Sequence, residues 1–317
     1  VPVHLHGLWG TIASRSKRYL WPRPFRPVDL HIGPHQPADT PVATARDHVM
    51  QLSYEQAQER ADRDGRTLGT AVLRQAKLHP RHVAVHDAGG TISTLQLAAL
   101  AQALIGRLGL AADETRVGVL LPPGRGGAIV NAALAIAGRT AVNLNHTAGT
   151  TQVARMIDMA GVRTIITAGL YLRRIGGDLA LTPRLVHLEE VLPTISKLAI
   201  AWRMALTLLL PTRWLARSRP GDVAAIIFSS GSTGDPKGVE LTHRQILANC
   251  DSVAHALHLE QGRDVILNPL PLFHSFGLIP GTWLGLVLGM RCAHQPDPTD
   301  AKALGLLAEQ AGATFLL

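Results

Sequence analysis

Aromatic residues and cysteines are both scarce in this sequence. Phe, Trp and Tyr make up only 4% of the 317 residues, so leucine, alanine, valine and isoleucine must build the core. The two cysteines, Cys250 and Cys292, lie far apart and form no CxxC pair. This excludes a disulfide framework and fits a reducing compartment. Because the sequence has no zinc-finger spacing and no aromatic platform for stacking bases, we expect no nucleic-acid partner.

The sequence has no long apolar run either. Its most apolar stretch, Leu198–Leu210, is interrupted by Arg203 and falls well short of the roughly 20 residues that span a bilayer. We expect this stretch to form an ordinary buried helix. Its flanking basic residues leave attachment to a membrane surface open as the alternative.

Acidic residues are in deficit. The 31 Lys and Arg exceed the 23 Asp and Glu, which gives a net charge of +8 with neutral histidine. A basic balance suits nucleotides, anionic lipids or an acidic protein, and it does not choose among them. Hydrophobic residues make up 46% of the chain and charged residues 17%, which is typical of a globular protein. The length predicts about two domains.

Composition divides the chain into three regions. Residues 1–52 are rich in Pro, Arg and His. Residues 53–80 begin polar and then show apolar residues at helical spacing, so we interpret them as a connecting helix. From residue 81 onward, strand-like and helical runs alternate.

This alternation predicts an α/β fold with mostly parallel sheets flanked by helices. Strands are expected at Val83–His86, Val117–Leu121, Ala141–Leu144, Arg163–Thr167, Leu185–Leu188, Val223–Ser229, Val265–Asn268, Met290–Ala293 and Thr314–Leu317. Helices are expected at Thr94–Leu108, Ala128–Ala137, Thr151–Ala160, Leu192–Leu209, His243–Leu257, Pro280–Leu288 and Asp300–Ala311.

The segment Ser229–Gly238 has the composition of a phosphate-binding loop. It ends a buried-strand pattern and reads SSGSTGDPKG. Glycines can expose backbone N–H groups, hydroxyls add donors, and a lysine places a point charge against a polyphosphate. The order Pro-Lys-Gly differs from the Walker A loop, where Gly precedes the lysine and Ser or Thr follows it. On composition alone, a purely structural hairpin loop is the alternative.

The longer string Phe228–His243 resembles the signature of the adenylate-forming (AMP-binding) superfamily, whose pattern is close to T-S-G-[ST]-T-G-x-P-K-G. Ser229 stands where the family usually has Thr, which keeps the hydroxyl. The resemblance implies ATP and Mg²⁺ as cofactors, a catalytic role for Lys237, and help from Thr233 in placing the metal. It implies ATP-phosphate binding by Ser229, Ser230, Gly231, Ser232, Thr233, Gly234 and Lys237.

A second segment agrees with this resemblance. Asn268–Gly277 (NPLPLFHSFG) is similar to the family's aromatic-histidine segment, which lines the acyl and adenylate pockets. The similarity implies substrate binding by Phe273, His274 and Gly277, and a catalytic role for His274. Since the chain has 15 histidines, a histidine that serves only its own loop is the alternative.

Other stretches resemble a narrower group. Val117–Gly124, Ala137–Gly149 and Gly161–Ala168 are similar to the synthetase part of the bifunctional acyl-[acyl-carrier-protein] synthetase/2-acylglycerophosphoethanolamine acyltransferases. The N-terminal strings VPV and GLWG resemble the end of a glycerolipid acyltransferase domain. This implies an acyltransferase remnant at 1–52 and the N-terminal part of an AMP-binding adenylation domain at 81–317.

The resemblance also implies an internal fragment that is incomplete and inactive alone. The family's magnesium-binding Glu and C-terminal catalytic Lys would lie beyond Leu317, and the acyltransferase H-x-x-x-x-D pair would lie before Val1. One string of that form, His82–Asp87, occurs downstream of the remnant, and we interpret it as chance.

The implied reaction is activation of a fatty acid to its acyl-adenylate and transfer to the thiol of acyl carrier protein, which would feed lysophospholipid acylation. An acyl-CoA synthetase, with CoA as acceptor, or another adenylate-forming ligase is the main alternative. Lysophospholipid acyltransfer as the principal function and a non-catalytic remnant are the others. The implied partners include a lysophospholipid and a membrane surface. The implied location is the cytoplasm, either free or peripherally associated with the inner membrane.

Overall fold

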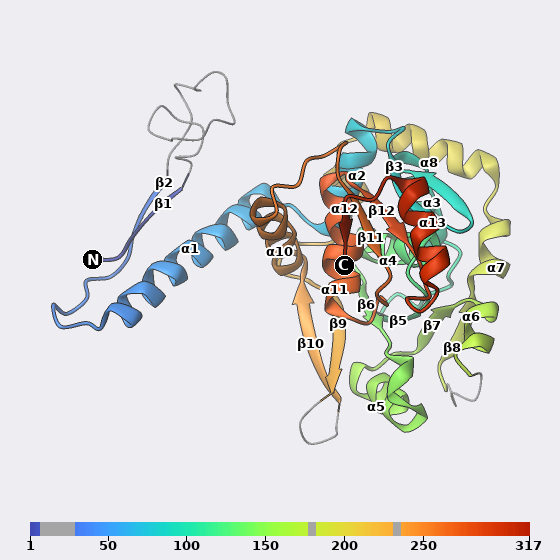
Figure 1. Cartoon of the computed structure of the whole chain (residues 1–317), viewed down its shortest axis with the longest axis horizontal. Helices are drawn as coiled ribbons and strands as arrows, with labels where there is room; N and C mark the ends of the chain where they lie inside the picture. Colours follow the sequence, from blue (N-terminus) through green and yellow to red (C-terminus); the bar gives the residue numbers. More distant parts are fainter. Residues whose placement is uncertain (7–28, 177–181, 231–235) are drawn as a thin grey trace. The chain divides into compact units, whose positions relative to one another are not determined.

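The computed structural model describes residues 1–6, 29–176, 182–230 and 236–317 (Figure 1). The chain forms two compact units, Val1–Asp64 and Gly65–Leu317.

The first unit is small. Strand β1 (Val3–His6) pairs antiparallel with β2 (Asp29–Ile32), so that Val3 lies opposite Ile32. Helix α1 (Val42–Asp64) follows.

The single connecting helix expected over 53–80 is replaced by two helices. Helix α1 ends at Asp64, Gly65 adopts a left-handed φ of +58°, and α2 (Leu68–Leu78) begins after Thr67. Thr67 caps α2 because its hydroxyl accepts from the backbone N–H of Thr70 at 3.1 Å. The apolar face of α2 lies in the main core of the second unit.

The second unit contains two sheets. The larger one has the order β10-β9-β6-β5-β7-β8. Its strands are β5 (Arg116–Leu120), β6 (Thr140–Asn143), β7 (Thr164–Thr167), β8 (Arg184–His187), β9 (Val223–Ser230) and β10 (Pro236–Thr242). Only the hairpin of β9 and β10 is antiparallel; all other pairs are parallel.

The smaller sheet has the order β13-β11-β12-β3-β4. Its strands are β3 (Val83–Asp87), β4 (Gly90–Ser93), β11 (Val265–Asn268), β12 (Arg291–His294) and β13 (Phe315–Leu316). The hairpin of β3 and β4 is antiparallel and the other pairs are parallel.

Helices cover both faces of the larger sheet. The main core packs α2, α3 (Thr94–Ile105) and α4 (Arg125–Ala137) against one set of strand residues, including Val117, Val119 and Ile227. A second core packs α5 (Thr150–Ala160) against the alternate set, including Ile165 and Phe228. This alternation is the period-two pattern of a sheet buried on both sides, and it confirms the predicted α/β fold.

The remaining helical segments complete the second unit. They are η1 (His146–Ala148), α6 (Gly169–Arg174), α7 (Leu188–Val191), η2 (Leu192–Thr194), α8 (Lys197–Leu209), α9 (Thr212–Leu215), α10 (His243–Ala256), α11 (Ser275–Leu278), η3 (Ile279–Trp283), α12 (Leu284–Leu288) and α13 (Ala301–Ala311).

The expectations of one helix over Leu192–Leu209 and of a buried helix over Leu198–Leu210 are both wrong. The chain turns at Ile195, and Ser196 starts a new helix by accepting from the N–H of Ala199 at 3.1 Å. The outer face of α8 is exposed. Among the described residues, no single helix is long and apolar enough to cross a membrane; the segments Leu188–Thr194 and Lys197–Leu209 reach the length only as a pair bent by 80°.

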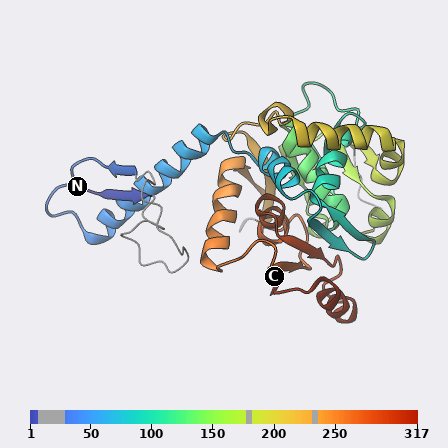
Figure 2. The ribbon, with the colours of Figure 1, turned by 90° about the horizontal axis from the view of Figure 1, so that it is seen from above.

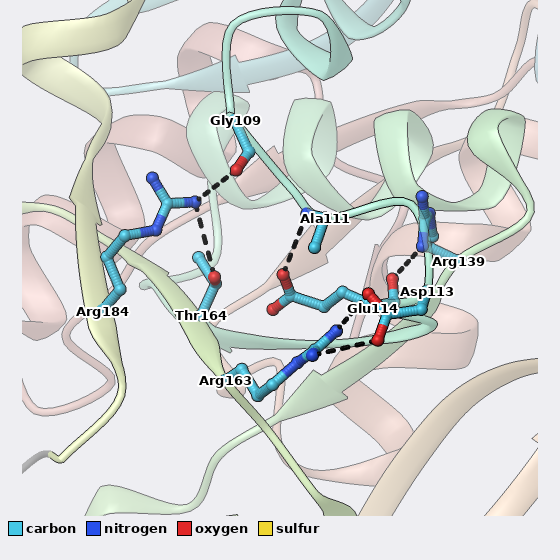
Figure 3. Close-up of polar contacts among 8 residues, drawn as sticks. All are labelled: Gly109, Ala111, Asp113, Glu114, Arg139, Arg163, Thr164 and Arg184. Carbon is cyan, nitrogen blue, oxygen red and sulfur yellow. Dashed lines mark hydrogen bonds and ion pairs between the residues drawn. The ribbon is translucent and has the colours of Figure 1, made fainter.

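Polar contacts tie the loop before β5 to the amino ends of β6, β7 and β8 (Figure 3). Asp113 forms a two-pronged ion pair with Arg163, with N–O distances of 2.9 and 3.1 Å. Arg139 donates to the carbonyl of Glu114, and Arg184 donates to the carbonyl of Gly109. These contacts lie at the sheet edge opposite to the carboxyl ends of the strands.

Asp87 joins the smaller sheet to helix α4. Its carboxylate accepts from the backbone N–H of Arg125 at 2.8 Å and from the Arg125 Nε at 2.9 Å. It also accepts from the N–H of Gly89 at 2.9 Å. His82 lies at the other end of β3 from Asp87, so the string His82–Asp87 forms no paired site, in agreement with the interpretation as chance.

We expect Asp87→Ala to lower the free energy of unfolding by about 1–3 kcal/mol. The substitution removes a charged cap from α4 and leaves half-buried donors unpaired. Urea unfolding of the 317-residue chain measures the change. Asp113→Ala is the control, because it removes a fully exposed ion pair and should leave the unfolding midpoint nearly unchanged. Equal losses in the two variants would contradict this account.

Candidate functional site

A cavity of about 610 Å³ opens at one edge of both sheets. Its volume falls in the range of small-molecule sites. The lining is mainly apolar, with a few polar side chains. It comprises Pro122, Pro123, His146, Thr147, Ala168, Leu170, Tyr171, Arg174, Ile175, Pro269, Pro271, Phe273, Pro296, Asp297 and Pro298.

Every lining residue follows the carboxyl end of a parallel strand. They come from the segments after β5, β6 and β7 in the larger sheet and after β11 and β12 in the smaller one. Crevices outside the carboxyl ends of parallel strands are the general ligand sites of open α/β sheets. The topology therefore makes this edge the candidate site.

Three aromatic rings from different segments meet in the cavity. The His146 ring makes edge-on contacts with Tyr171 and Phe273, with ring centroids 5.5 and 5.3 Å apart. The Tyr171 hydroxyl lies 3.5 Å from the Nδ1 of His146. Burial raises the pKa of Tyr171 to about 12 and lowers the pKa of His146, so both groups are neutral near pH 7. The cluster thus offers a substrate an apolar wall and neutral hydrogen-bonding groups.

The predicted phosphate loop leaves the same edge of the sheet. Strand β9 runs parallel to β6, so its carboxyl end, at Ser230, points the same way as the end of β6. Lys237 pairs directly with Ser229 across the hairpin, which places their side chains on one face. Both side chains are exposed. A hydroxyl and an ammonium that flank the loop suit a polyphosphate.

Most of the loop lies outside the described residues. The predicted phosphate-binding residues Gly231, Ser232, Thr233 and Gly234 belong to this segment, and so does the predicted metal contact of Thr233. Among the residues that the structure describes, no group of three His, Cys, Asp or Glu side chains could hold a metal ion.

Asn268 holds the aromatic-histidine segment in shape. It is fully buried at the end of β11, accepts from the N–H of Leu270 at 2.9 Å and donates to the carbonyl of Gly277 at 3.0 Å. Its amide nitrogen also lies 3.3 Å from the Nδ1 of His294. Burial lowers the pKa of His294 to about 4, so the neutral ring can accept this hydrogen bond.

The predicted residues of this segment have different positions. Phe273 lines the cavity. His274 is exposed and caps α11, since its Nδ1 accepts from the N–H of Phe276 at 3.3 Å. Gly277 is buried, and a Cβ there would lie 2.2 Å from the carbonyl oxygen of Pro271. The structure brings Phe273 into the cavity; it does not place His274 or Lys237 on the cavity wall.

Sequence reasoning missed His146 and Tyr171. Both follow the ends of expected strands, and that position is the signal that could have singled them out. His146 lies inside the resemblance stretch Ala137–Gly149 but was not assigned a role there, and Tyr171 lies in none of the quoted stretches.

A family model described as "AMP-binding enzyme" matches residues 72–317. The chain belongs to the AMP-binding enzyme family. The matched region begins inside α2 and includes every strand of the two sheets.

Curated relatives in this family align with the chain over short stretches. The medium-chain fatty-acid–CoA ligase of Escherichia coli (strain K12) is 34% identical over 128 residues, which are 40% of this chain and 22% of that protein. The long-chain-fatty-acid–CoA ligase of Bacillus subtilis (strain 168) is 41% identical over 82 residues, 25% of this chain and 15% of that protein. The chain thus spans less than a quarter of the length of these two relatives.

Solved structures share the AMP-binding fold. The o-succinylbenzoate CoA synthetase of Bacillus subtilis, in complex with its acyl-adenylate intermediate, has a TM-score of 0.64 and 18% identity over 78% of this chain and 60% of that one. The same enzyme in complex with ATP and magnesium ion has a TM-score of 0.63 and 18% identity over 78% and 62%. At this identity the likeness shows the fold alone.

We expect Gly277→Ala to destabilise the chain by about 1–3 kcal/mol. The added Cβ meets backbone carbonyl oxygens of Leu270 and Pro271, so the whole segment must shift. Gly305→Ala on α13 is the matched control: its Cβ meets nothing within 4 Å, and helix propensity predicts a gain of roughly 0.5–1 kcal/mol. Urea unfolding compares the two, and a neutral or stabilising Gly277→Ala would contradict the packing described.

Stability should fall on acidification between pH 6.5 and about pH 4. The pKa of buried His294 drops from 6.5 to about 4 on folding, so the unfolded chain takes up its proton first. The pKa of buried His243 is lowered in the same way. Each group should contribute a slope of up to about 1.4 kcal/mol per pH unit within this window.

Urea unfolding at a series of pH values measures this slope in the wild-type chain and in His294→Gln. The variant cannot titrate at this position, so its slope should be shallower. Equal slopes would show that His294 does not carry the proton linkage.

Proposed function

We propose that the polypeptide containing this chain activates a fatty acid with ATP and transfers the acyl group to a thiol. The observation that carries the proposal is the meeting of two features at one sheet edge. Ser229 and Lys237 flank the phosphate-loop segment, and the apolar cavity around His146 and Phe273 opens at the same edge.

Two steps account for the chemistry. A fatty-acid carboxylate attacks the α-phosphorus of ATP, the bond to the β-phosphate oxygen breaks, and acyl-adenylate and pyrophosphate form. A thiolate then attacks the acyl carbon and AMP leaves. Positioning and charge neutralisation are the protein's main contributions to such transfers at phosphorus.

The described residues have separate roles in this proposal. Lys237 stabilises charge on the departing pyrophosphate, and the Ser229 hydroxyl donates to a phosphate oxygen. Mg²⁺, when bound, supplies further neutralisation, and Thr233 is its proposed contact. Phe273 and His146 form the wall beside the acyl chain, while Asn268 fixes the segment that carries Phe273. The family resemblance supports a catalytic role for His274, which is exposed at the start of α11 and lies off the cavity wall.

The identity of the thiol acceptor distinguishes two candidate functions. Fatty-acid–CoA ligases among the AMP-binding relatives support CoA. The subgroup resemblance of Val117–Gly124 and Ala137–Gly149, together with the charge of +8, supports acyl carrier protein, a role that would feed lysophospholipid acylation. Under that second proposal, residues 1–52 are the end of an acyltransferase domain and residues 81–317 belong to the adenylation domain. The enzyme is then cytoplasmic, either free or peripherally associated with the inner membrane.

ATP–pyrophosphate exchange tests the first step. The longest natural polypeptide that contains these residues is assayed with a long-chain fatty acid and, separately, with a panel of amino acids. Exchange that requires the fatty acid supports the proposal. Exchange that requires an amino acid overturns the proposal. The absence of exchange with every acid in the assay also overturns it. Competing acyl transfer to CoA and to acyl carrier protein then separates the two acceptors.

In this assay Lys237→Ala should lower the exchange rate by roughly 10²–10³-fold, because a preorganised charge at the phosphates is lost. Lys302→Ala, an exposed lysine on α13, is the matched control and should retain the wild-type rate. A Lys237→Ala rate within a few-fold of wild type would remove Lys237 from the proposed mechanism.

A further inference from the structure

The outward face of α8 is apolar and uncovered by other described parts of Gly65–Leu317, and the short helix α9 that follows it exposes a tryptophan. Leu198, Trp202 and Leu209 are 80%, 62% and 76% exposed and recur at spacings of four and seven residues. These spacings place them on one helix face. Trp214 on α9 is 68% exposed. These four residues are called the α8–α9 face below.

The opposite side of α8 is fixed to the core. Thr207 is fully buried and accepts from the Nε2 of Gln102 on α3 at 2.7 Å. Ala199 and Ile200 pack against the main hydrophobic cluster. The helix is therefore presented rigidly, and the exposure of its outer face is not the result of a loosely attached segment.

The sequence that forms this face carries charge of one sign. Between Glu190 and Asp222 the sequence holds no acidic residue, while Lys197, Arg203, Arg213, Arg217 and Arg219 contribute five positive charges. Lys77 of α2 adds a sixth, since its Nζ donates to the carbonyl of Leu210 at the end of α8.

We infer that the α8–α9 face docks onto an anionic lipid bilayer, with α8 lying in the plane of the interface. An exposed apolar stripe, two tryptophans and a basic surround are the features of helices that bind at lipid headgroups. A protein partner would need an apolar groove surrounded by acidic residues to match this face. An anionic bilayer offers negative headgroups and apolar acyl chains over any area. The inference does not depend on the proposed ATP chemistry.

Docking of α8 on a bilayer is compatible with access to the phosphate-loop end of the β9–β10 hairpin. Helix α8 lies along the outer edge of the second unit in both views (Figures 1 and 2). In Figure 1 it lies at the upper right, whereas the end of β9 and the start of β10 lie at the lower edge. Docking through α8 thus leaves that end of the hairpin facing away from the lipid.

Vesicle co-sedimentation of the full 317-residue chain tests the inference. The vesicles are equal parts phosphatidylglycerol and phosphatidylethanolamine, with pure phosphatidylcholine as the neutral comparison. We expect binding to the anionic vesicles and at least ten-fold weaker binding to the neutral ones. Raising the salt to about 0.5 M should weaken the anionic binding, because the Debye length shortens.

Two variants separate the apolar and the charge contributions. Trp202→Gln/Leu209→Gln should weaken binding at least ten-fold at any salt concentration. Lys197→Gln/Arg213→Gln should weaken it by roughly 25-fold at low salt, or about five-fold per charge, and much less at high salt. The matched controls Leu306→Gln and Lys302→Gln alter an exposed leucine and an exposed lysine on α13 and should bind as wild type. Circular dichroism confirms that each variant is folded.

Three results would overturn the inference. The first is no binding to anionic vesicles by the folded chain. The second is an equal loss of binding in the α13 controls. The third is a concentration-dependent dimer that Trp202→Gln dissociates, seen by analytical ultracentrifugation without vesicle binding, which would assign the face to a second copy of the chain.

Discussion

The parallel pairing of β9 with β6 decides where the candidate site lies. Because these strands run the same way, the loop after Ser230 leaves the sheet at the edge where the segments after β5, β6 and β7 line the cavity. The antiparallel return through β10 then sets Lys237 opposite Ser229. Reversing β9 would carry the phosphate loop to the other edge, among the ion pairs of Figure 3. Strand direction thus brings a loop for phosphates and a cavity for an apolar group to one side of the molecule.

Polar contacts then fix the details of that side. Asn268 ties the end of β11 to Gly277, and Asp87 ties the end of β3 to the start of α4. Asn268 accepts from the N–H of Leu270 and donates to the carbonyl of Gly277, while Asp87 accepts from the N–H groups of Gly89 and Arg125. Each side chain therefore holds a loop that hydrophobic packing alone would leave free to shift. The cavity wall is therefore built on rigid strands but shaped by a small number of polar anchors.

Buried strands were predictable because they are short, continuous apolar runs, as at Val265–Asn268, where the prediction matches the structure residue for residue. Turns inside helical patterns were not. Nothing in the periodicity marks the break at Gly65, and the turn before Ser196 depends on one capping hydroxyl. The exposed face of α8 was misjudged because apolar content does not say which face a neighbour covers. His146, Tyr171 and Phe273 meet only through the topology, so no local pattern could join them.

Hydrogen–deuterium exchange of the 317-residue chain, with and without ATP and Mg²⁺, tests the central claim that one sheet edge holds the nucleotide. The account predicts protection on nucleotide addition in two segments that are far apart in sequence: the β9–β10 hairpin over 223–242 and the segment over 268–278. Protection of the hairpin alone would mean that the nucleotide binds at the phosphate loop without contacting the segment that lines the cavity. Protection of neither segment, with binding shown independently by calorimetry, would contradict the assignment of the site.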